Sequence, residues 1–267
     1  MKKRIILIKL GGSLITDKNK PFTPKISVID DLSRQIKEAL DEDKNLQLIV
    51  GNGGGSFPHY PALKYNMNEG IKKEEQKFGF CLVQDAASSL NRIVVNSLLK
   101  QKLNAVSLNP SSMIVTKKGK IKKFFSYPLF LMINLGLIPV TYGDIVLDEE
   151  KGSFIISTEM VLNFIALFLK KKGFHIDKII HNGLTSGVLN EKGDTIEEIN
   201  FKNFSQVKKN FYQTLGFDVT GGMLHKVKES LYLSKYGIKS FIINGTVEKN
   251  LLKNALLGKK VKGTLIT

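Results

Sequence analysis

The stretch IILIKLGGS, residues 5–13, decides the fold class of this chain, because a short apolar run leads directly into two glycines. The run Ile5–Ile8 is shorter than the roughly 7 to 15 apolar residues of a signal peptide, so it predicts a buried strand. Gly11 and Gly12 let the backbone approach a ligand closely, and their amides suit anionic oxygens. A plain tight turn is the alternative for this motif taken alone. We therefore expect a buried strand followed by a turn that can bind an anion.

Further apolar runs share the β-branched composition of the first one, and stretches with helical spacing separate several of them. This alternation is typical of a mostly parallel sheet with helices on both faces, where ligands gather at the carboxyl ends of the strands. We therefore predict an α/β protein, a three-layer αβα sandwich. The predicted strands are Ile5–Ile8, Leu46–Val50, Ala105–Leu108, Leu137–Thr141, Ile176–Ile180 and Ser240–Ile243, and the predicted helices are Ile26–Leu40, Glu75–Leu99, Glu159–Leu169 and Met223–Tyr236.

Two segments, Met113–Phe125 and Ile145–Ile156, interrupt the alternation of strands and helices. Each has a Lys-Gly turn between two strand-like halves, a pattern typical of a β-hairpin. We predict that both hairpins are added to the central sheet. No Ser- or Pro-rich linker divides the chain, so a single domain over residues 1–267 is expected.

The composition excludes several classes of protein. With 267 residues, 42% of them hydrophobic, the chain can bury a sizeable core and is not extensively disordered. Its longest weakly charged stretch, Phe124–Val140, is shorter than the roughly 20 apolar residues of a membrane span, so no membrane partner is expected. Cys81 is the only cysteine, which excludes an intramolecular disulfide and a C-x-x-C site. We expect a cytoplasmic protein.

The net charge of +16 raises the alternative of a nucleic-acid-binding protein. Only Arg4, Arg34 and Arg92 among the 40 basic residues are arginine, whereas recognition of bases and phosphates favours the bidentate guanidinium group. The lysine runs also lack interleaved aromatic residues. We therefore expect no nucleic-acid partner.

Two more glycine clusters follow the pattern of the first. Gly53, Gly54 and Gly55 come directly after the second predicted strand, and three adjacent glycines favour close packing against a ligand. The cluster DVTGGM, residues 218–223, opens a predicted helix that carries Lys226, which places free amides near an ammonium group. An Asp or Thr N-cap explains the last cluster equally well when it is taken alone. Together, the three clusters predict binding of phosphate-bearing ligands.

The motifs KLGGSLITDK at residues 9–18, GGGSFPH at residues 53–59 and DVTGGM followed by Lys226 resemble those of the amino acid kinase superfamily. Within it, they are most similar to the isopentenyl phosphate kinase branch. The resemblance implies the amino acid kinase fold, ATP and Mg²⁺, and phosphoryl transfer to the phosphate of isopentenyl phosphate, a small-molecule partner. It also implies a homodimer, with an acceptor-binding lobe over residues 1–172 and a nucleotide-binding lobe over residues 173–267.

The resemblance also implies roles for individual residues. It assigns no protein ligand to a metal, and it leaves the other histidines, His175, His181 and His225, as structural residues. His59 would hold the acceptor phosphate, either as a cation or as a neutral N–H donor. The implied catalytic residues are Lys9, Lys18, His59 and Lys226; those that bind the nucleotide are Lys9, Gly11, Gly12, Ser13, Gly55, Gly183, Gly222 and Lys226; those that bind the acceptor are Gly54, His59, Asp144, Thr158 and Glu159.

The chain departs from the family pattern at several places, among them Asn52 and Pro58, which replace a His and a Gly around the triple glycine. Thr158 and Glu159 stand where the family usually has Gly-Asp, which predicts a retuned acceptor site. The segment Gly183–Val188 replaces a Thr-Asp-Val-Asp-Gly-Val loop and lacks both aspartates, which leaves the nucleotide preference open.

Three functions therefore stay open at this point. The leading one is an isopentenyl phosphate kinase, whose substrate tail needs an apolar wall. Another phosphate or phosphonate kinase, similar to fosfomycin kinase, is the enzymatic alternative, and a nucleotide-binding module without turnover is the alternative of a different class. The helix Glu75–Leu99 is expected to supply the wall through Phe78, Phe80, Leu82, Val83 and Ala86.

Overall fold

The central sheet has eight strands in the order β10-β12-β11-β9-β1-β2-β6-β3 in the computed structural model, which describes residues 3–213, 219–246 and 248–267. Neighbouring strands are parallel except β11 and β12. All six predicted strands are present, whereas β10 and β12, two and three residues long, are too short to show a periodic pattern. The strands are β1 Arg4–Leu10, β2 Leu46–Asn52, β3 Ala105–Ser107, β6 Ile138–Tyr142, β9 Ile176–Gly183, β10 Glu198–Ile199, β11 Lys239–Asn244 and β12 Thr264–Ile266.

The two predicted hairpins form a second sheet of their own, with the strand order β5-β4-β7-β8. The prediction that they join the central sheet is wrong, because β4 and β7 pair with each other in parallel, with Val115 opposite Leu147. This sheet buries Ile114, Val146 and Ile156 in the same apolar cluster as the helix that follows it. Its strands are β4 Ile114–Lys117, β5 Lys120–Phe124, β7 Asp144–Asp148 and β8 Gly152–Ile156.

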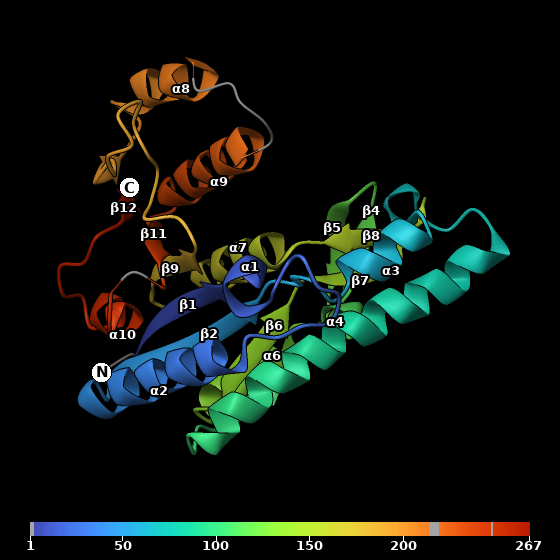
Figure 1. Ribbon diagram of the computed structural model, residues 1–267. Helices are drawn as coiled ribbons and strands as arrows, with labels where there is room; N and C mark the ends of the chain where they lie inside the picture. The colour runs from blue at the N-terminus through green and yellow to red at the C-terminus, as the bar shows by residue number, and fades with distance from the viewer. Residues whose placement is uncertain (1–2, 214–218, 247) are drawn as a thin grey trace.

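Helices cover both faces of the central sheet, as the sequence predicted (Figure 1). Among the described residues, no helix has both the length and the apolar character needed to span a membrane. The helices are α1 Gly12–Ile15, α2 Ile26–Glu42, α3 His59–Lys64, η1 Met67–Glu69, α4 Glu74–Lys100, α5 Pro110–Met113, α6 Tyr127–Asn134, α7 Thr158–Lys171, α8 Phe204–Gln213, α9 Val219–Ser234 and α10 Leu251–Leu256.

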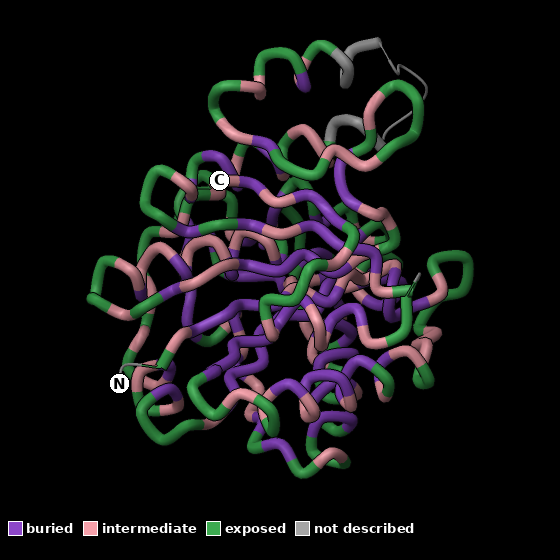
Figure 2. The backbone as a smooth tube through the Cα atoms, turned by 90° about the vertical axis from the view of Figure 1, so that its left-hand side faces the viewer, coloured by how far each residue is buried: buried purple, intermediate pink, exposed green. Residues whose placement is uncertain are grey.

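Side chains on β1 alternate between two apolar cores, which fixes the layers. Ile6 and Ile8 belong to a core with α2, α4 and α10, whereas Ile5 and Leu7 belong to a core with α6 and α7. Figure 2 shows the buried segments concentrated in the central strands. Because both faces of β1 pack into these cores, residues Ile5–Ile8 form a continuous apolar run in the sequence.

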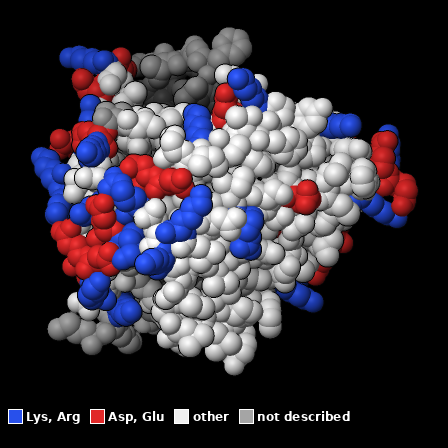
Figure 3. All heavy atoms as spheres, turned by 60° about the horizontal axis from the view of Figure 1, so that its bottom comes forward, with Lys and Arg blue, Asp and Glu red and all other residues white. Residues whose placement is uncertain are grey.

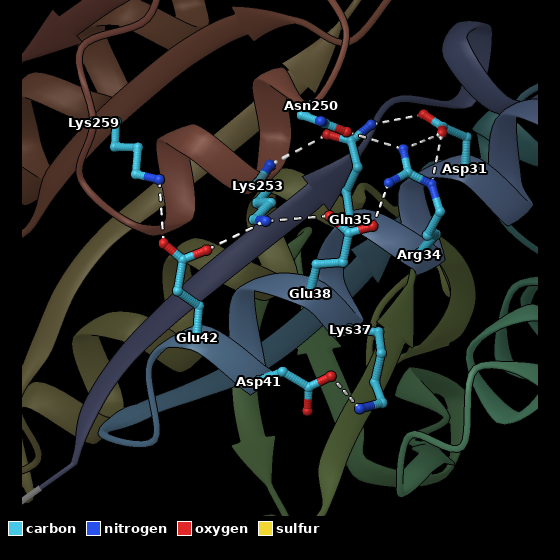
Figure 4. Close-up of polar contacts among 10 residues, drawn as sticks. All are labelled: Asp31, Arg34, Gln35, Lys37, Glu38, Asp41, Glu42, Asn250, Lys253 and Lys259. Carbon is cyan, nitrogen blue, oxygen red and sulfur yellow. Dashed lines mark hydrogen bonds and ion pairs between the residues drawn. The ribbon is translucent and has the colours of Figure 1, made fainter.

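Polar contacts join α10 to α2, although the two helices lie far apart in the sequence (Figure 4). Lys253 Nζ lies 3.3 Å from Glu38 Oε2 and 3.2 Å from Glu42 Oε2, and Lys259 Nζ lies 3.2 Å from Glu42 Oε1. The amide of Lys253 also donates a hydrogen bond to Gln35 Oε1. These contacts tie the end of the chain to its first long helix.

Candidate active site

Two glycine loops meet at the carboxyl ends of β1 and β2, which are parallel neighbours. A Cβ added at Gly12 would lie 2.4 Å from the amide nitrogen of Gly55, and one at Gly53 would lie 2.6 Å from the amide nitrogen of Gly12. Gly55 also has a φ of 55°, a conformation that residues with a side chain rarely adopt. The two loops therefore pack backbone against backbone, and only glycine fits there.

Thr16 joins the two loops through its buried hydroxyl group. The hydroxyl donates a hydrogen bond to the carbonyl of Gly12 at 2.8 Å and accepts one from the amide of Ser56 at 3.0 Å. A buried hydroxyl with both a donor and an acceptor partner carries no unsatisfied group. The relative position of the loops is thus fixed before any ligand binds.

A cavity of about 240 Å³ lies against these loops. Its lining combines Lys9, Lys18 and His59 with apolar side chains from α3, α4 and β8. Among the five apolar residues predicted to form a wall on α4, only Val83 lines the cavity, while Phe80 packs against the same apolar cluster as Val83. The rest of the apolar lining comes from Ala62, Ile155 and Ile156, and the glycines of both loops complete it.

His59 is the first residue of α3 and shares the lining of the cavity with Lys18. Partial burial and, to a smaller extent, the positive charge of Lys18 lower the pKa of His59. The imidazole is therefore neutral at neutral pH and carries one N–H donor. Of the two states that the sequence left open, this lowered pKa favours the neutral donor.

Asp144 is the first residue of β7, and its buried carboxylate also lines the cavity. Its Oδ2 accepts a hydrogen bond from the amide of Ser111 at 3.0 Å, and its Oδ1 accepts one from the amide of Ile145 at 2.9 Å. Burial raises the pKa of Asp144 to about 6 in spite of these bonds. Asp144 therefore fixes the start of the hairpin beside α5.

Glu159 lies at the centre of a cationic cluster. Its Oε1 is 3.1 Å from Lys9 Nζ and 3.1 Å from Lys226 Nζ, so residues from β1, α7 and α9 converge on one oxygen. Burial opposes ionisation of Glu159, but the charges of the two lysines outweigh it and lower its pKa to about 2. Burial, together with the charge of Lys226, lowers the pKa of Lys9. The site thus holds two ammonium groups that contact the same oxygen of one carboxylate, and Lys9 stands just before the first glycine loop.

The model of the amino acid kinase family matches residues 4–244 of the chain. The chain belongs to this family. It is 34% identical to the isopentenyl phosphate kinase of Methanocaldococcus jannaschii, with 98% of each chain covered. It is also 34% identical to that of Methanothermobacter thermautotrophicus, with 98% of this chain and 99% of the relative covered. A solved structure titled "X-ray structures of isopentenyl phosphate kinase" superimposes with a TM-score of 0.78 at 28% identity, covering 99% of this chain and all of the other.

In this amino acid kinase, two of the predicted site residues, Gly11 and Thr158, donate their hydrogen bonds to backbone carbonyls of the protein. The amide of Gly11 donates to the carbonyl of Asn182 at 2.8 Å, so Gly11 extends the β1–β9 pairing instead of offering a free donor. The hydroxyl of Thr158 donates to the carbonyl of Asn52 at 2.8 Å, while its Cγ2 faces Gly51. Gly12 and Ser13, in contrast, occupy the first turn of α1 and line the cavity, and the first amides of a helix lack acceptors within it.

The third glycine cluster is only partly described. Asp218 lies outside the described residues, and α9 begins at Val219, so Gly222 stands inside the helix and not before it. A Cβ at Gly222 or at Gly183 would meet no atom of the described residues within 4 Å, so neither position requires glycine for lack of space. The structure thus brings Lys226, but not Gly222, into contact with the other predicted residues.

His181 contacts the cluster around Glu159, although we expected it, like His175 and His225, to be a structural residue. It lies on β9 directly beside Lys9 of β1, and its Nδ1 is 3.6 Å from Glu159 Oε1. The signal available in the sequence was its place at the carboxyl end of a predicted strand, where sites of parallel sheets form.

Within the described ranges, no group of three His, Cys, Asp or Glu side chains is placed to hold a metal ion. The carboxylate of Glu159 already contacts two lysines, and that of Asp144 accepts hydrogen bonds from two backbone amides. A metal that acts at this site would therefore take its ligands mainly from the substrates and water.

Proposed function

We propose that this chain transfers the γ-phosphoryl group of ATP to the phosphate of isopentenyl phosphate, giving isopentenyl diphosphate for isoprenoid synthesis. The observation that carries the proposal is the cavity whose lining combines Lys18 and His59 with the apolar Ala62, Val83 and Ile155. A phosphate monoester with a short branched tail matches both parts of this lining. The relatives named isopentenyl phosphate kinase, which align over nearly the full length, support the same acceptor.

On the acceptor side, we assign the phosphate to His59, Lys18 and the backbone of Gly54. A neutral N–H from His59 binds one phosphate oxygen, and Lys18 neutralises the charge of the group in transfer. Asp144 and Thr158 shape the cavity and do not bind the phosphate, because their oxygens already bond to the backbone. Of the five residues predicted for the acceptor side, Gly54 and His59 keep a role in binding the phosphate, whereas Asp144, Thr158 and Glu159 support the site.

On the donor side, we assign the phosphates of ATP to the amides of Gly12, Ser13 and Gly55 and to the ammonium groups of Lys9 and Lys226. Backbone amides at the start of a helix and in a glycine loop suit anionic oxygens, and the contact between the loops of Gly12 and Gly55 keeps these amides close together. In this assignment residues 1–172 bind the acceptor and also contact the ATP phosphates, while residues 173–267, which include Lys226, Gly183 and Gly222, bind the remainder of the nucleotide.

Phosphoryl transfer between two phosphates needs little covalent chemistry from the protein. The acceptor phosphate is already an anion at neutral pH, so no general base has to remove a proton from it. The chain contributes in-line positioning and neutralisation of charge, and Glu159 keeps Lys9 and Lys226 in place before the substrates bind.

Mg²⁺ is the expected metal. When bound, it neutralises charge between the phosphates of the nucleotide. The residues around the glycine loops fit a metal held mostly by phosphate oxygens and water, since Glu159 is the carboxylate that faces the lysines and is occupied by them.

We also propose that the protein is a homodimer. Figure 3 shows a face on which charged side chains gather at one side, while the remainder is largely uncharged. The helix α4 runs along this lower face, and between Phe78 and Leu99 it carries only two charged residues. Phe78 is 60% exposed and Leu99 is 47% exposed. Light scattering on the purified protein tests this assignment.

The proposed reaction is tested by a coupled assay of ADP release with ATP and Mg²⁺ against isopentenyl phosphate, dimethylallyl phosphate and fosfomycin. We expect the highest kcat/KM with isopentenyl phosphate, and mass spectrometry of the product should give the mass of isopentenyl diphosphate. Preference for fosfomycin would replace this function with the phosphonate kinase. ATP binding without ADP release for any acceptor would instead favour the binding module.

A further inference from the structure

His181 is buried in the site without a hydrogen-bond partner. Its side chain is 3% exposed, and neither Nδ1 nor Nε2 has a partner in the part of the chain that the structure describes. Most buried polar side-chain atoms are hydrogen-bonded, because an unsatisfied one costs free energy. An imidazole in this state beside the reacting groups requires an explanation beyond packing.

The position of His181 follows from the parallel pairing of β1 and β9. Lys9 and His181 stand at the same register position, so both side chains project from the same face of the sheet, toward α7. Nδ1 of His181 is 3.6 Å from Glu159 Oε1, the same oxygen that Lys9 and Lys226 contact at 3.1 Å. A shift of a few tenths of an ångström brings Nδ1 within hydrogen-bond distance.

The charge state of His181 is set by its surroundings. Burial is the main cause that lowers its pKa, to about 3, and the charges of Lys226 and Lys9 act in the same direction. The ring is therefore neutral at neutral pH and carries a single N–H. It can donate to a carboxylate without adding a third positive charge to a site that already holds two lysines.

We propose that His181 is a positioning residue whose Nδ1–H holds the carboxylate of Glu159 while Lys9 and Lys226 turn toward the phosphates. The inference rests on the proposed function, since it assumes that the lysines bind phosphate oxygens during turnover. A largely buried carboxylate that loses an ammonium donor is left under-satisfied unless another donor replaces it. His181 is the neighbouring side chain that faces the same oxygen, and it stays in place because β9 is a central strand.

His181 also lines a second cavity, to which Glu159 and Lys226 of the same cluster contribute. This cavity of about 570 Å³ is lined by His181 together with Asn163, His225 and Lys226. Asn163 Oδ1 is also buried without a partner among the described residues. With the proton on Nδ1, Nε2 is an acceptor that has no partner among the described residues, so the choice of this tautomer rests on the position of Nδ1 opposite Glu159 Oε1.

Three variants of His181 separate positioning from packing. His181→Leu removes both nitrogens, His181→Asn keeps a donor near the place of Nδ1, and His181→Gln keeps one near the place of Nε2. We expect His181→Leu to lower kcat by roughly 10- to 100-fold, the range for a hydrogen bond to a charged group, with both KM values changed less than about twofold. His181→Asn should recover most of the loss, and His181→Gln should recover less.

A double-mutant cycle then asks whether His181 acts through Glu159. In a Glu159→Gln background, His181→Leu should cause no further loss of kcat, because the carboxylate it positions is gone. The proposal would be overturned if His181→Leu lowered kcat by the same factor in the Glu159→Gln background as in the wild type. It would also be overturned if the His181→Leu enzyme had the wild-type kcat. A wild-type protein that fails to phosphorylate isopentenyl phosphate would instead count against the proposed function.

A measurement that does not need turnover completes the test. Long-range ¹H–¹⁵N NMR spectra of the histidine rings report which nitrogen carries the proton. We expect a neutral His181 protonated at Nδ1 at pH 7, and the same tautomer after a non-hydrolysable ATP analogue binds. A cationic ring, or a proton on Nε2 in the nucleotide complex, would contradict the assignment whichever acceptor the enzyme uses.

Discussion

Gly12 and Gly55 contact each other backbone to backbone, at the point where the loops after β1 and β2 meet. The distance of 2.4 Å between a Cβ built at Gly12 and the amide nitrogen of Gly55 leaves no room for any side chain. Because both residues line the cavity, the contact that packs the loops also shapes the proposed phosphate site.

Gly12→Ala is expected to separate the two loops. We predict a loss of at least about tenfold in kcat/KM, because a displacement near 1 Å at reacting groups is costly, together with a lower Tm. Gly222→Ala is the control for stability, since a Cβ there meets no atom within 4 Å in the part of the chain that the structure describes. Steady-state kinetics and thermal unfolding check both variants, and an unchanged Gly12→Ala enzyme would contradict the described contact.

Lys18→Ala should lower kcat much more than it raises either KM. A charge that meets the moving phosphoryl group acts mainly in the transition state, and losing one such group typically costs about 100-fold or more. Lys20→Ala is the matched control, because Lys20 is an exposed lysine near the same loop that does not line the cavity. Equal turnover of the two variants would remove Lys18 from the proposed chemistry.

His59 variants should rank in activity as His, then Gln or Asn, then Ala. Alanine removes the neutral N–H, so we expect roughly a 10- to 100-fold loss in kcat/KM for the phosphate acceptor and little change in the KM for ATP. His175→Ala, an exposed histidine elsewhere, is the control. If ATP binding weakens as much as acceptor binding does, His59 supports the loop and does not bind the acceptor.

The raised pKa of Asp144 makes stability depend on pH. Between about pH 4 and 6 the folded protein holds a proton that the unfolded chain has lost, so this group lowers the free energy of unfolding as the pH rises through that window. The contribution is about 1.4 kcal/mol per unit of pKa difference. Asp144→Asn should flatten the slope in that window relative to the wild type, which urea unfolding at a series of pH values measures. Parallel profiles for the two proteins would show that Asp144 ionises normally.

Lys253→Ala should destabilise the protein in a salt-dependent way. It removes the contacts of one ammonium group with Glu38 and Glu42, which join α10 to α2. We expect a lower Tm at low ionic strength and a smaller difference at about 1 M salt, where the Debye length is near 3 Å. Lys77→Ala breaks a pair with Glu74 on the same helix and should lower the Tm less. The opposite order would show that α10 is held by its apolar contacts alone.

The sequence by itself determined the elements of this fold and the loops that carry its chemistry. Apolar runs such as Ile5–Ile8 and the glycines that follow them are local patterns, and each expresses a property of the backbone that needs no distant partner. Parallel pairing of consecutive βα units then places the loops at one edge of the sheet. For this reason the cluster of glycines and lysines could be predicted, as could its resemblance to a kinase family.

Only the tertiary structure decided which of these residues meet. His181 enters the site because β9 pairs with β1 in a register that sets it beside Lys9. The hairpins form a separate sheet because β4 pairs with β7, and no local pattern encodes that choice. The amide of Gly11 donates a hydrogen bond to the carbonyl of Asn182 because the pairing of β1 with β9 sets these two residues side by side. Contacts between residues far apart in the chain depend on strand order and register, and these are settled by the packing of the whole core, which a single sequence pattern does not contain.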